Sequence, residues 1–154
     1  MNWSEQSMNY NYMKLVLLST LFYLLIPHQV DAGEFDNIKV DVLAKSSFSW
    51  DGSHLPSYST GVPEITILRI TIPPDTQLPI HQHPHINAGV LLRGKLTVTT
   101  ENGYTLYLKS GDSIVETVNK WHYGKNENYD PAEMIVFYAG VKDGINSIVK
   151  SYGE

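Results

Sequence analysis

The sequence predicts an all-β protein, an antiparallel barrel or jelly roll, that follows a signal peptide and an N-terminal arm. Short β-prone segments recur about every 8 to 12 residues, and turn-forming pairs such as Asn102-Gly103 separate them. Almost no segment shows the 3.6-residue periodicity of an amphipathic helix. The expected organisation is a signal peptide over residues 1–32, an arm over residues 33–62 and a barrel over residues 63–154.

The composition narrows the classes of partner. The chain has 154 residues, of which 42% are hydrophobic and 18% charged, as expected for one ordinary globular domain. A formal net charge of −5 without a basic cluster argues against a nucleic-acid partner. The sequence contains no cysteine, so disulfides are excluded. We therefore expect a small molecule or an ion as ligand.

Residues Met13–Ala32 have the anatomy of a secretory signal peptide: a lysine, an apolar run, a proline and small residues before the cleavage site. The apolar run Leu15–Ile26 would span only about 18 Å as a helix, against about 30 Å of hydrocarbon core. A membrane anchor and a buried core helix are the alternatives. The preceding residues carry no positive charge, so translation could start at Met8 or Met13. We expect an exported protein, periplasmic or secreted, with no membrane contact after the signal is removed.

Residues 33–62 are loosely patterned and rich in Ser, Gly and Pro, which is typical of an arm rather than of a packed layer. Trp50, Leu55 and Tyr58 are expected to pack this arm onto the barrel. His54 stands alone beside Gly52 and Pro56, so we expect it to be an exposed loop residue.

The barrel segment contains six expected strands. The first, Glu64–Ile72, is rich in β-branched residues and ends at Pro73-Pro74. The others are Ala88–Arg93, Lys95–Thr100, Tyr104–Leu108, Ser113–Glu116 and Ala132–Ala139. Residues 141–154 are expected to form a last short strand or a loose end.

Three of the six histidines stand at alternate positions in LPIHQHPHINAGVLLRG, which begins at Leu78. Residues two apart in a strand share a face, so His81 and His83 can reach one ion, and imidazole is the commonest metal ligand. Pro84 disfavours a continuous strand, so we expect a bend with His85 at its tip and Asn87 opening the next strand. The expected source of a third imidazole is His122 in NKWHYGKNEN.

These residues resemble the two motifs of the cupin family. The first motif, G-x5-H-x-H-x3-4-E-x6-G, aligns with His81, His83, Asn87 and Gly94. The second motif, G-x5-P-x-G-x2-H-x3-N, aligns with Gly111, Thr117, Asn119, His122 and Asn126. The resemblance extends over about Glu64–Ala139 and implies a single-domain, cupin-type jelly-roll barrel.

The sequence departs from the motifs at four positions. Asp75 replaces the opening glycine, and Thr117 and Asn119 replace the proline and glycine of the second motif. Asn87 replaces the glutamate, which removes one negative charge from the expected coordination sphere. Either Asn87 completes a site of three histidines and one asparagine, or three histidines leave two or three positions open, as in the thiol dioxygenase branch of the superfamily. A third alternative is a barrel that holds no metal.

Other polar residues near the motifs have simpler expected roles. Asn126 is expected to satisfy loop backbone groups, and Trp121 and Tyr123 are expected to pack. Glu116 has no charge partner that the sequence identifies, and it would act as a base or an extra ligand only if it faced the cavity. No residue is assigned as catalytic.

The resemblance implies one divalent metal ion, Fe, Mn, Zn or Ni, with His81, His83, His122 and Asn87 as the metal-binding residues. The expected function is an exported metal-binding cupin, either an oxygenase or an isomerase acting on a small organic substrate. The alternatives are a non-catalytic ligand-binding or sensing module and a structural barrel with a vestigial site. Many cupins pair through an edge strand or an N-terminal arm, so a homodimer built on Glu34–Trp50 is also expected.

Overall fold

The computed structural model describes residues 38–151. The expected signal peptide, residues 1–32, and the beginning of the expected arm lie outside the described residues, so both stay predictions. The chain divides into two units, Met1–Val40 and Asp41–Glu154, and all strands among the described residues belong to the second. Within residues 38–151, no helix has the length and hydrophobicity needed to cross a bilayer.

The described fold is all β, as the sequence predicts. The longer strands are β1 (Pro63–Ile72), β4 (Asn87–Arg93), β5 (Lys95–Thr100), β6 (Thr105–Lys109), β8 (His122–Asn126) and β9 (Ala132–Val141). The shorter strands are β2 (Thr76–Gln77), β3 (His81–Gln82), β7 (Ser113–Val115) and β10 (Ile148–Val149).

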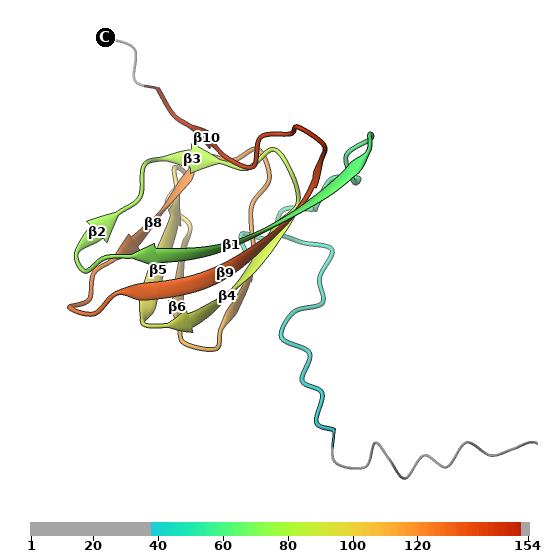
Figure 1. Ribbon diagram of the computed structural model, residues 1–154. Coiled ribbons are helices and arrows are strands. Elements are labelled where there is room, and N and C mark those ends of the chain that lie inside the picture. The colour runs from blue at the N-terminus through green and yellow to red at the C-terminus, as the bar shows by residue number, and fades with distance from the viewer. Residues whose placement is uncertain (1–37, 152–154) are drawn as a thin grey trace, which may run out of the picture. The chain divides into compact units, whose positions relative to one another are not determined.

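The strands form two antiparallel sheets. One sheet has the order β1-β9-β4-β7, and the other has the order β10-β3-β8-β5-β6 with β2 paired to β8. Strand β9 returns late in the sequence to lie between β1 and β4, as Figure 1 shows. Such non-consecutive neighbours distinguish a jelly roll from a simple meander, so the predicted architecture is confirmed.

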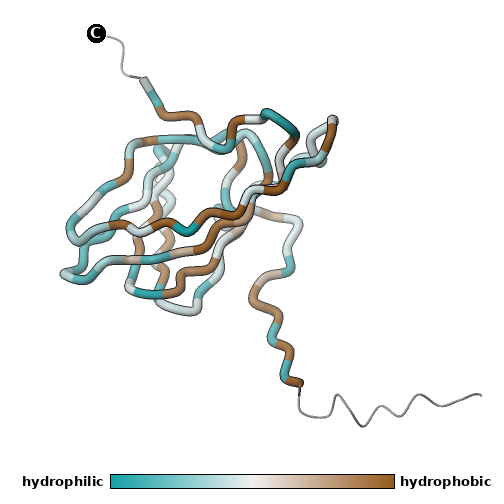
Figure 2. The backbone as a smooth tube through the Cα atoms, in the orientation of Figure 1, coloured by the Kyte–Doolittle hydropathy of each residue, from teal (hydrophilic) through white to brown (hydrophobic). Residues whose placement is uncertain are grey.

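The two sheets pack through side chains at alternate positions of their strands. Ile72, Leu91 and Met134 come from the first sheet, and Leu96 and Val98 come from the second. All five belong to one cluster of buried residues, because residues two apart on a strand face the same side. Figure 2 shows hydrophobic residues along the strands and more hydrophilic colour in the connecting loops. Burial of this shared apolar surface is the main force that holds the sheets together.

The expected strand bounds agree with the observed ones to within two residues, and Lys95–Thr100 agrees at both ends. Strand β8 was not predicted, nor was the two-residue β2. The inward positions of β8 are His122, Gly124 and Asn126, all buried, so the apolar alternation that normally identifies a strand is absent. The tail contains β10, which pairs with β3; of the two expectations for this segment, the short strand is correct.

Trp50 packs against the hydrophobic core, as expected, and its backbone N–H donates to the carbonyl of Val115 across 2.9 Å. The expectation for Tyr58 is wrong, since 76% of that residue is exposed. Residues 56–65 around it are all exposed as well. His54 is exposed, and its ring contacts that of Phe48 with centroids 4.3 Å apart.

Two of the departures from the cupin motifs preserve the backbone shape that glycine would provide. Asp75 has φ 45° and Asn119 has φ 55°, and both stand where a motif has glycine. Asp and Asn adopt this left-handed conformation at lower cost than other non-glycine residues. The motif glycines that the sequence retains, Gly94 and Gly111, also have positive φ, 82° and 91°. The turns around the site are therefore kept despite the substitutions.

Candidate metal centre

The three histidines that the sequence singles out converge at one end of the barrel. His81 lies in β3 and His122 begins β8, and the two residues are partners in the antiparallel β3–β8 pairing. His83 follows β3 and forms a parallel bridge with Val118. The ring centroids are 4.5 Å apart for His81 and His122, 4.9 Å for His81 and His83, and 5.0 Å for His83 and His122. Strand pairing therefore brings together two segments about 40 residues apart.

The spacing of the ring nitrogens suits a single ion. One potential ligand atom from each histidine lies within 4.8 Å of those from the other two. Three nitrogens bound to one ion at about 2.1 Å lie roughly 3 to 3.6 Å from one another. Closing of the widest pair by roughly 1 Å would thus suffice, and the three histidines could hold a metal.

The hydrogen bonds of the rings decide which nitrogen is free to bind. Nδ1 of His81 lies 2.7 Å from the Pro79 carbonyl oxygen. Nδ1 of His83 lies 2.9 Å from the carbonyl oxygen of Asn146, and Nδ1 of His122 lies 2.9 Å from that of Lys120. A carbonyl oxygen can only accept, so each Nδ1 carries the proton and each neutral ring keeps a lone pair on Nε2. Such backbone contacts orient histidines at metal sites.

The environment also keeps these rings uncharged. His83 and His122 are 4% and 1% exposed. Burial lowers the pKa of all three histidines, and it lowers the pKa of His83 to about 4. Since a metal ion competes with protons for the same lone pair, neutral rings at pH 7 are in the state that binds metal.

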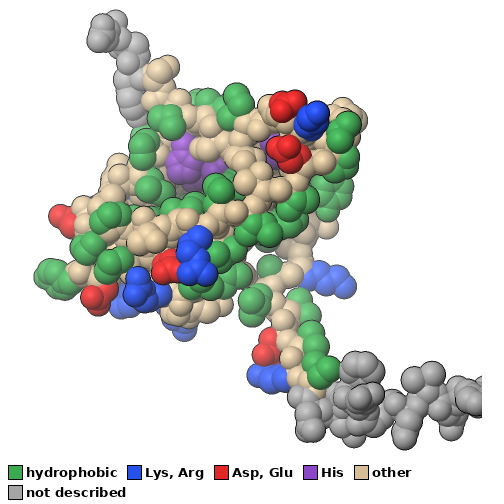
Figure 3. All heavy atoms as spheres, viewed as in Figure 1, with side chains coloured by type: hydrophobic (Ala, Val, Ile, Leu, Met, Phe, Trp, Pro, Cys, Tyr) green, Lys and Arg blue, Asp and Glu red, His purple; other side chains and the backbone are tan. Residues whose placement is uncertain are grey.

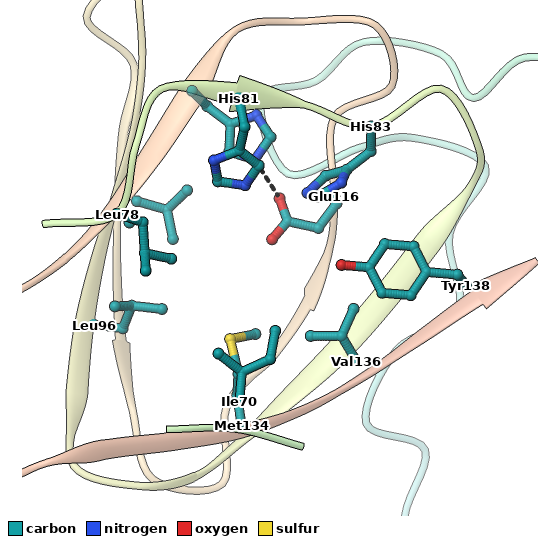
Figure 4. A pocket seen from close by; sticks show the side chains of 12 residues that line it. Ile70, Leu78, His81, His83, Leu96, Glu116, Met134, Val136 and Tyr138 are labelled. Carbon is teal, nitrogen blue, oxygen red and sulfur yellow. Dashed lines mark ion pairs between the residues drawn. The ribbon is translucent and has the colours of Figure 1, made fainter. Parts of the chain in front are cut away.

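The opposite sheet contributes a row of three polar residues. Asn87 and Tyr138 are partners in the β4–β9 pairing, and the backbone N–H of Glu116 donates to the Asn87 carbonyl across 3.0 Å. Figure 4 shows the Glu116 carboxylate and the Tyr138 hydroxyl directed into the space beside the histidines. Oε2 of Glu116 lies 3.7 Å from Nε2 of His122. The site is thus assembled from both sheets.

Glu116 faces the cavity, the position in which it could act as a base or an extra ligand. Its Oε2 is buried and has no hydrogen-bond partner. Burial raises the pKa of Glu116 to about 7. Interactions with the Thr117 backbone and the Trp50 side chain lower the pKa of this carboxyl but do not offset its burial. A buried carboxylate oxygen without a partner is costly to the fold, so Oε2 calls for a compensating partner.

Tyr138 is a cavity residue that the sequence reasoning missed. Its ring centroid lies 5.5 Å from that of His83, and burial raises the pKa of its hydroxyl to about 12. The hydroxyl is therefore protonated at neutral pH and can donate a hydrogen bond to a ligand. Its place in an apolar alternation, AEMIVFYAGV, suggests only core packing, so no sequence signal marks it.

Asn87 is 1% exposed, and its Nδ2 donates to the carbonyl of His85 across 3.2 Å. Its Oδ1 is buried and has no hydrogen-bond partner. Asn87 is not among the residues that line the cavity at the histidines. Its role as a metal ligand stays a prediction. His85 lies outside the cluster, with Nδ1 2.8 Å from the Ser59 hydroxyl.

Asn126 has the structural role expected of it. Its Nδ2 lies within hydrogen-bond distance of three carbonyl oxygens, those of Ile72, Pro73 and Asp130, at 3.1, 3.0 and 2.8 Å. The residue is fully buried, so it fastens two loops to β8. Trp121 is half-buried and lies beneath the Lys150 ammonium group, 5.6 Å from the ring centroid.

The space at the histidines is small and opens through an apolar mouth. The inner cavity measures about 40 Å³, enough for two or three water molecules. The mouth adds about 260 Å³, and its lining includes Leu68, Pro79 and Val149 together with His81 and His83. Figure 3 shows histidine side chains exposed at an opening between hydrophobic groups. Among the described residues, neither lining contains a lysine or an arginine.

Comparisons with solved structures agree with this fold. A chain from a study of the DMSP lyases RdDddP and RnDddQII superposes with a TM-score of 0.50 at 17% identity, covering 56% of this chain and 44% of that one. An oxalate oxidase in complex with glycolate gives a TM-score of 0.48 at 20% identity over 55% of this chain and 45% of that chain. The matched region therefore spans less than half the length of either protein.

A third structure is nearer in size. It is an uncharacterised conserved protein with a double-stranded β-helix domain from Klebsiella pneumoniae, with a TM-score of 0.49 at 19% identity over 61% of this chain and 89% of that chain. No curated protein matches the sequence. The sequence model of the Cupin domain family matches residues 68–138, which include every histidine of the cluster and Glu116. The chain therefore carries a cupin domain.

Proposed function

We propose that this chain is an exported metal-dependent oxygenase of the cupin type, which binds one divalent ion and acts on a small, partly apolar organic molecule. The observation that carries the proposal is the convergence of three histidines, two buried and His81 half-buried, whose Nδ1 atoms all lie against backbone carbonyls. The free Nε2 lone pairs then share one space. Neutral imidazoles suit Fe(II), Mn(II), Zn(II) or Ni(II), and such an ion supplies redox or Lewis-acid chemistry when bound.

The cavity has room for a small reactant beside the histidines and for a larger one at the mouth. About 40 Å³ is space for a diatomic molecule or a few waters, which suits dioxygen as one reactant. The mouth is lined largely by apolar side chains, and apart from the ion itself its described lining offers no cation to pair with a carboxylate or phosphate. The part of the substrate that lies in the mouth is therefore expected to be uncharged and partly apolar, with the Tyr138 hydroxyl as a hydrogen-bond donor.

Export and pairing belong to the same proposal and rest on the sequence. The Met13–Ala32 pattern supports removal of a signal peptide after Ala32. Mass spectrometry of the protein recovered outside the cytoplasm should give a chain that begins at Gly33, and a retained Met13–Ala32 segment would contradict export. Sedimentation of the same material tests the expected homodimer.

The function is tested in two steps. The purified protein is loaded with Fe(II), passed through gel filtration and measured by elemental analysis, next to a His81→Ala/His83→Ala variant and a His54→Ala control. We expect one ion per chain in the wild type and the control, and none in the double variant. Oxygen consumption is then followed with uncharged thiols and flavonols as candidate substrates.

The outcomes separate the alternatives. Metal with substrate-dependent oxygen consumption supports the oxygenase. Turnover of a substrate without oxygen consumption indicates an isomerase-type reaction, and bound metal with ligand binding but no turnover indicates a sensing module. Wild-type protein that retains no ion after gel filtration overturns the proposal.

A further inference from the structure

We infer that Glu116 supplies a carboxylate ligand to the metal centre. Glu116 directly follows β7 in the sheet opposite the histidines, whereas Asn87 stands where the cupin motif has its glutamate. This inference rests on the proposed function, since it assigns a residue to the same ion. It goes beyond the cluster of three histidines and names a fourth protein group that would contact the metal.

The position of the carboxylate is the first argument. Oε2 of Glu116 lies 3.7 Å from Nε2 of His122. Two atoms bound to one ion at about 2.1 Å lie roughly 3 to 3.5 Å apart in tetrahedral or octahedral arrangements. The observed separation is therefore close to that of two ligands of the same ion. Figure 4 shows the carboxylate directed toward the histidines, with a dashed line marking this pair.

The unsatisfied oxygen is the second argument. Glu116 is 7% exposed, and its Oε2 has no hydrogen-bond partner. Buried polar atoms in folded proteins are nearly always paired, and each exception calls for an explanation such as an ion. A cation held by the three Nε2 atoms would lie within reach of this oxygen and would satisfy it.

Charge is the third argument. Three neutral imidazoles leave a divalent ion with its full charge in a buried site, where uncompensated charge is costly. Glu116 is the one acidic residue in the lining of the cavity, as far as the described residues extend. Asn87 can offer only a neutral amide oxygen, and it is absent from that lining.

The backbone of Glu116 is held on both sides, which fixes the direction of its side chain. Its N–H donates to the Asn87 carbonyl across 3.0 Å, and its carbonyl accepts a hydrogen bond of 2.8 Å from the Ser49 hydroxyl. Ser49 is itself 5% exposed. The segment before the barrel thus helps to position Glu116.

The test compares Glu116→Gln with Glu127→Gln, which makes the same chemical change at an exposed carboxylate. Affinity for Co(II) is measured by competition with a chelator, and the visible absorption bands of the Co(II) protein report its ligands. Unfolding of the metal-free proteins at pH 8 provides a readout that does not involve metal. We expect Glu116→Gln to weaken Co(II) binding about 10- to 100-fold, to shift the absorption bands and to stabilise the metal-free fold.

Glu127→Gln should match the wild type in affinity and spectrum and lose little stability, because it gives up only an exposed ion pair with Lys125. Unchanged affinity and spectrum in Glu116→Gln, with Co(II) bound by the wild type, overturn this inference and leave the proposed function standing. Loss of both metal binding and metal-free stability would show a structural role and would also overturn it. A wild type that binds no Co(II) overturns both proposals.

Discussion

The backbone N–H of Asn119 donates to the carbonyl oxygen of His83 across 2.8 Å, while Asn119 itself has φ 55°. A residue in a strained turn thus holds the chain that carries a candidate metal ligand. Glycine adopts this conformation without strain. For asparagine it costs a little, and for alanine it costs about 1 kcal/mol or more.

We therefore expect Asn119→Ala to lower the free energy of unfolding by about 1 kcal/mol and Asn119→Gly to leave it nearly unchanged. Urea unfolding of the three proteins measures the difference. An alanine variant as stable as the wild type would show that the turn does not require the left-handed conformation.

The buried carboxylate predicts a pH-dependent difference between the wild type and Glu116→Gln in metal-free protein. The pKa of Glu116 rises from 4.5 to about 7 on folding, so above pH 4.5 the unfolded chain loses this proton while the folded chain keeps it. The carboxylate then costs stability progressively as the pH rises from 4.5 to about 7, and the cost stays constant above that. Its full size is on the order of 3 kcal/mol.

Thermal unfolding between pH 4.5 and 8.5, with a chelator present, checks this prediction. The glutamine variant should be close to the wild type at pH 4.5 and clearly more stable at pH 8. A difference that does not vary with pH would contradict the assignment of a raised pKa to Glu116.

Metal binding should raise the free energy of unfolding of the protein. An ion that binds only the folded chain, present at about 100 times its Kd, raises the free energy of unfolding by about 2.7 kcal/mol. His83→Ala removes one of the three imidazoles and should show little of this increase. The measurement is unfolding with and without Mn(II), and equal stabilisation of both proteins would place the ion elsewhere.

Packing makes a separate prediction at two adjacent leucines of β4. Leu91 is fully buried, whereas 43% of Leu92 is exposed. Leu91→Ala should cost about 2 to 5 kcal/mol through lost burial and a cavity, and Leu92→Ala should cost less than about 1 kcal/mol. Comparable losses at both positions in urea unfolding would mean that the outer face of this sheet is also covered.

The all-β class was predictable because its signals are local. Alternating β-prone residues in Glu64–Ile72 and the turn at Asn102-Gly103 act over a few residues, and these elements appear where expected. Strand β8 was not predictable in this way, because its buried positions are a histidine, a glycine and an asparagine. The side chains of Leu78 and Leu96 lie 3.5 Å from the position a Cβ would take at Gly124, an ordinary packing contact, and these neighbours are distant in the chain.

The amino-acid sequence alone determined the β architecture and the identity of the three histidines, because strand propensity, turn chemistry and motif spacing are properties of neighbouring residues. Only the tertiary structure decided that Glu116 and Tyr138 face those histidines, that each Nδ1 meets a backbone carbonyl, and that Tyr58 is exposed. These features depend on how one sheet lies against the other and on burial. Both are set by packing between segments far apart in the chain.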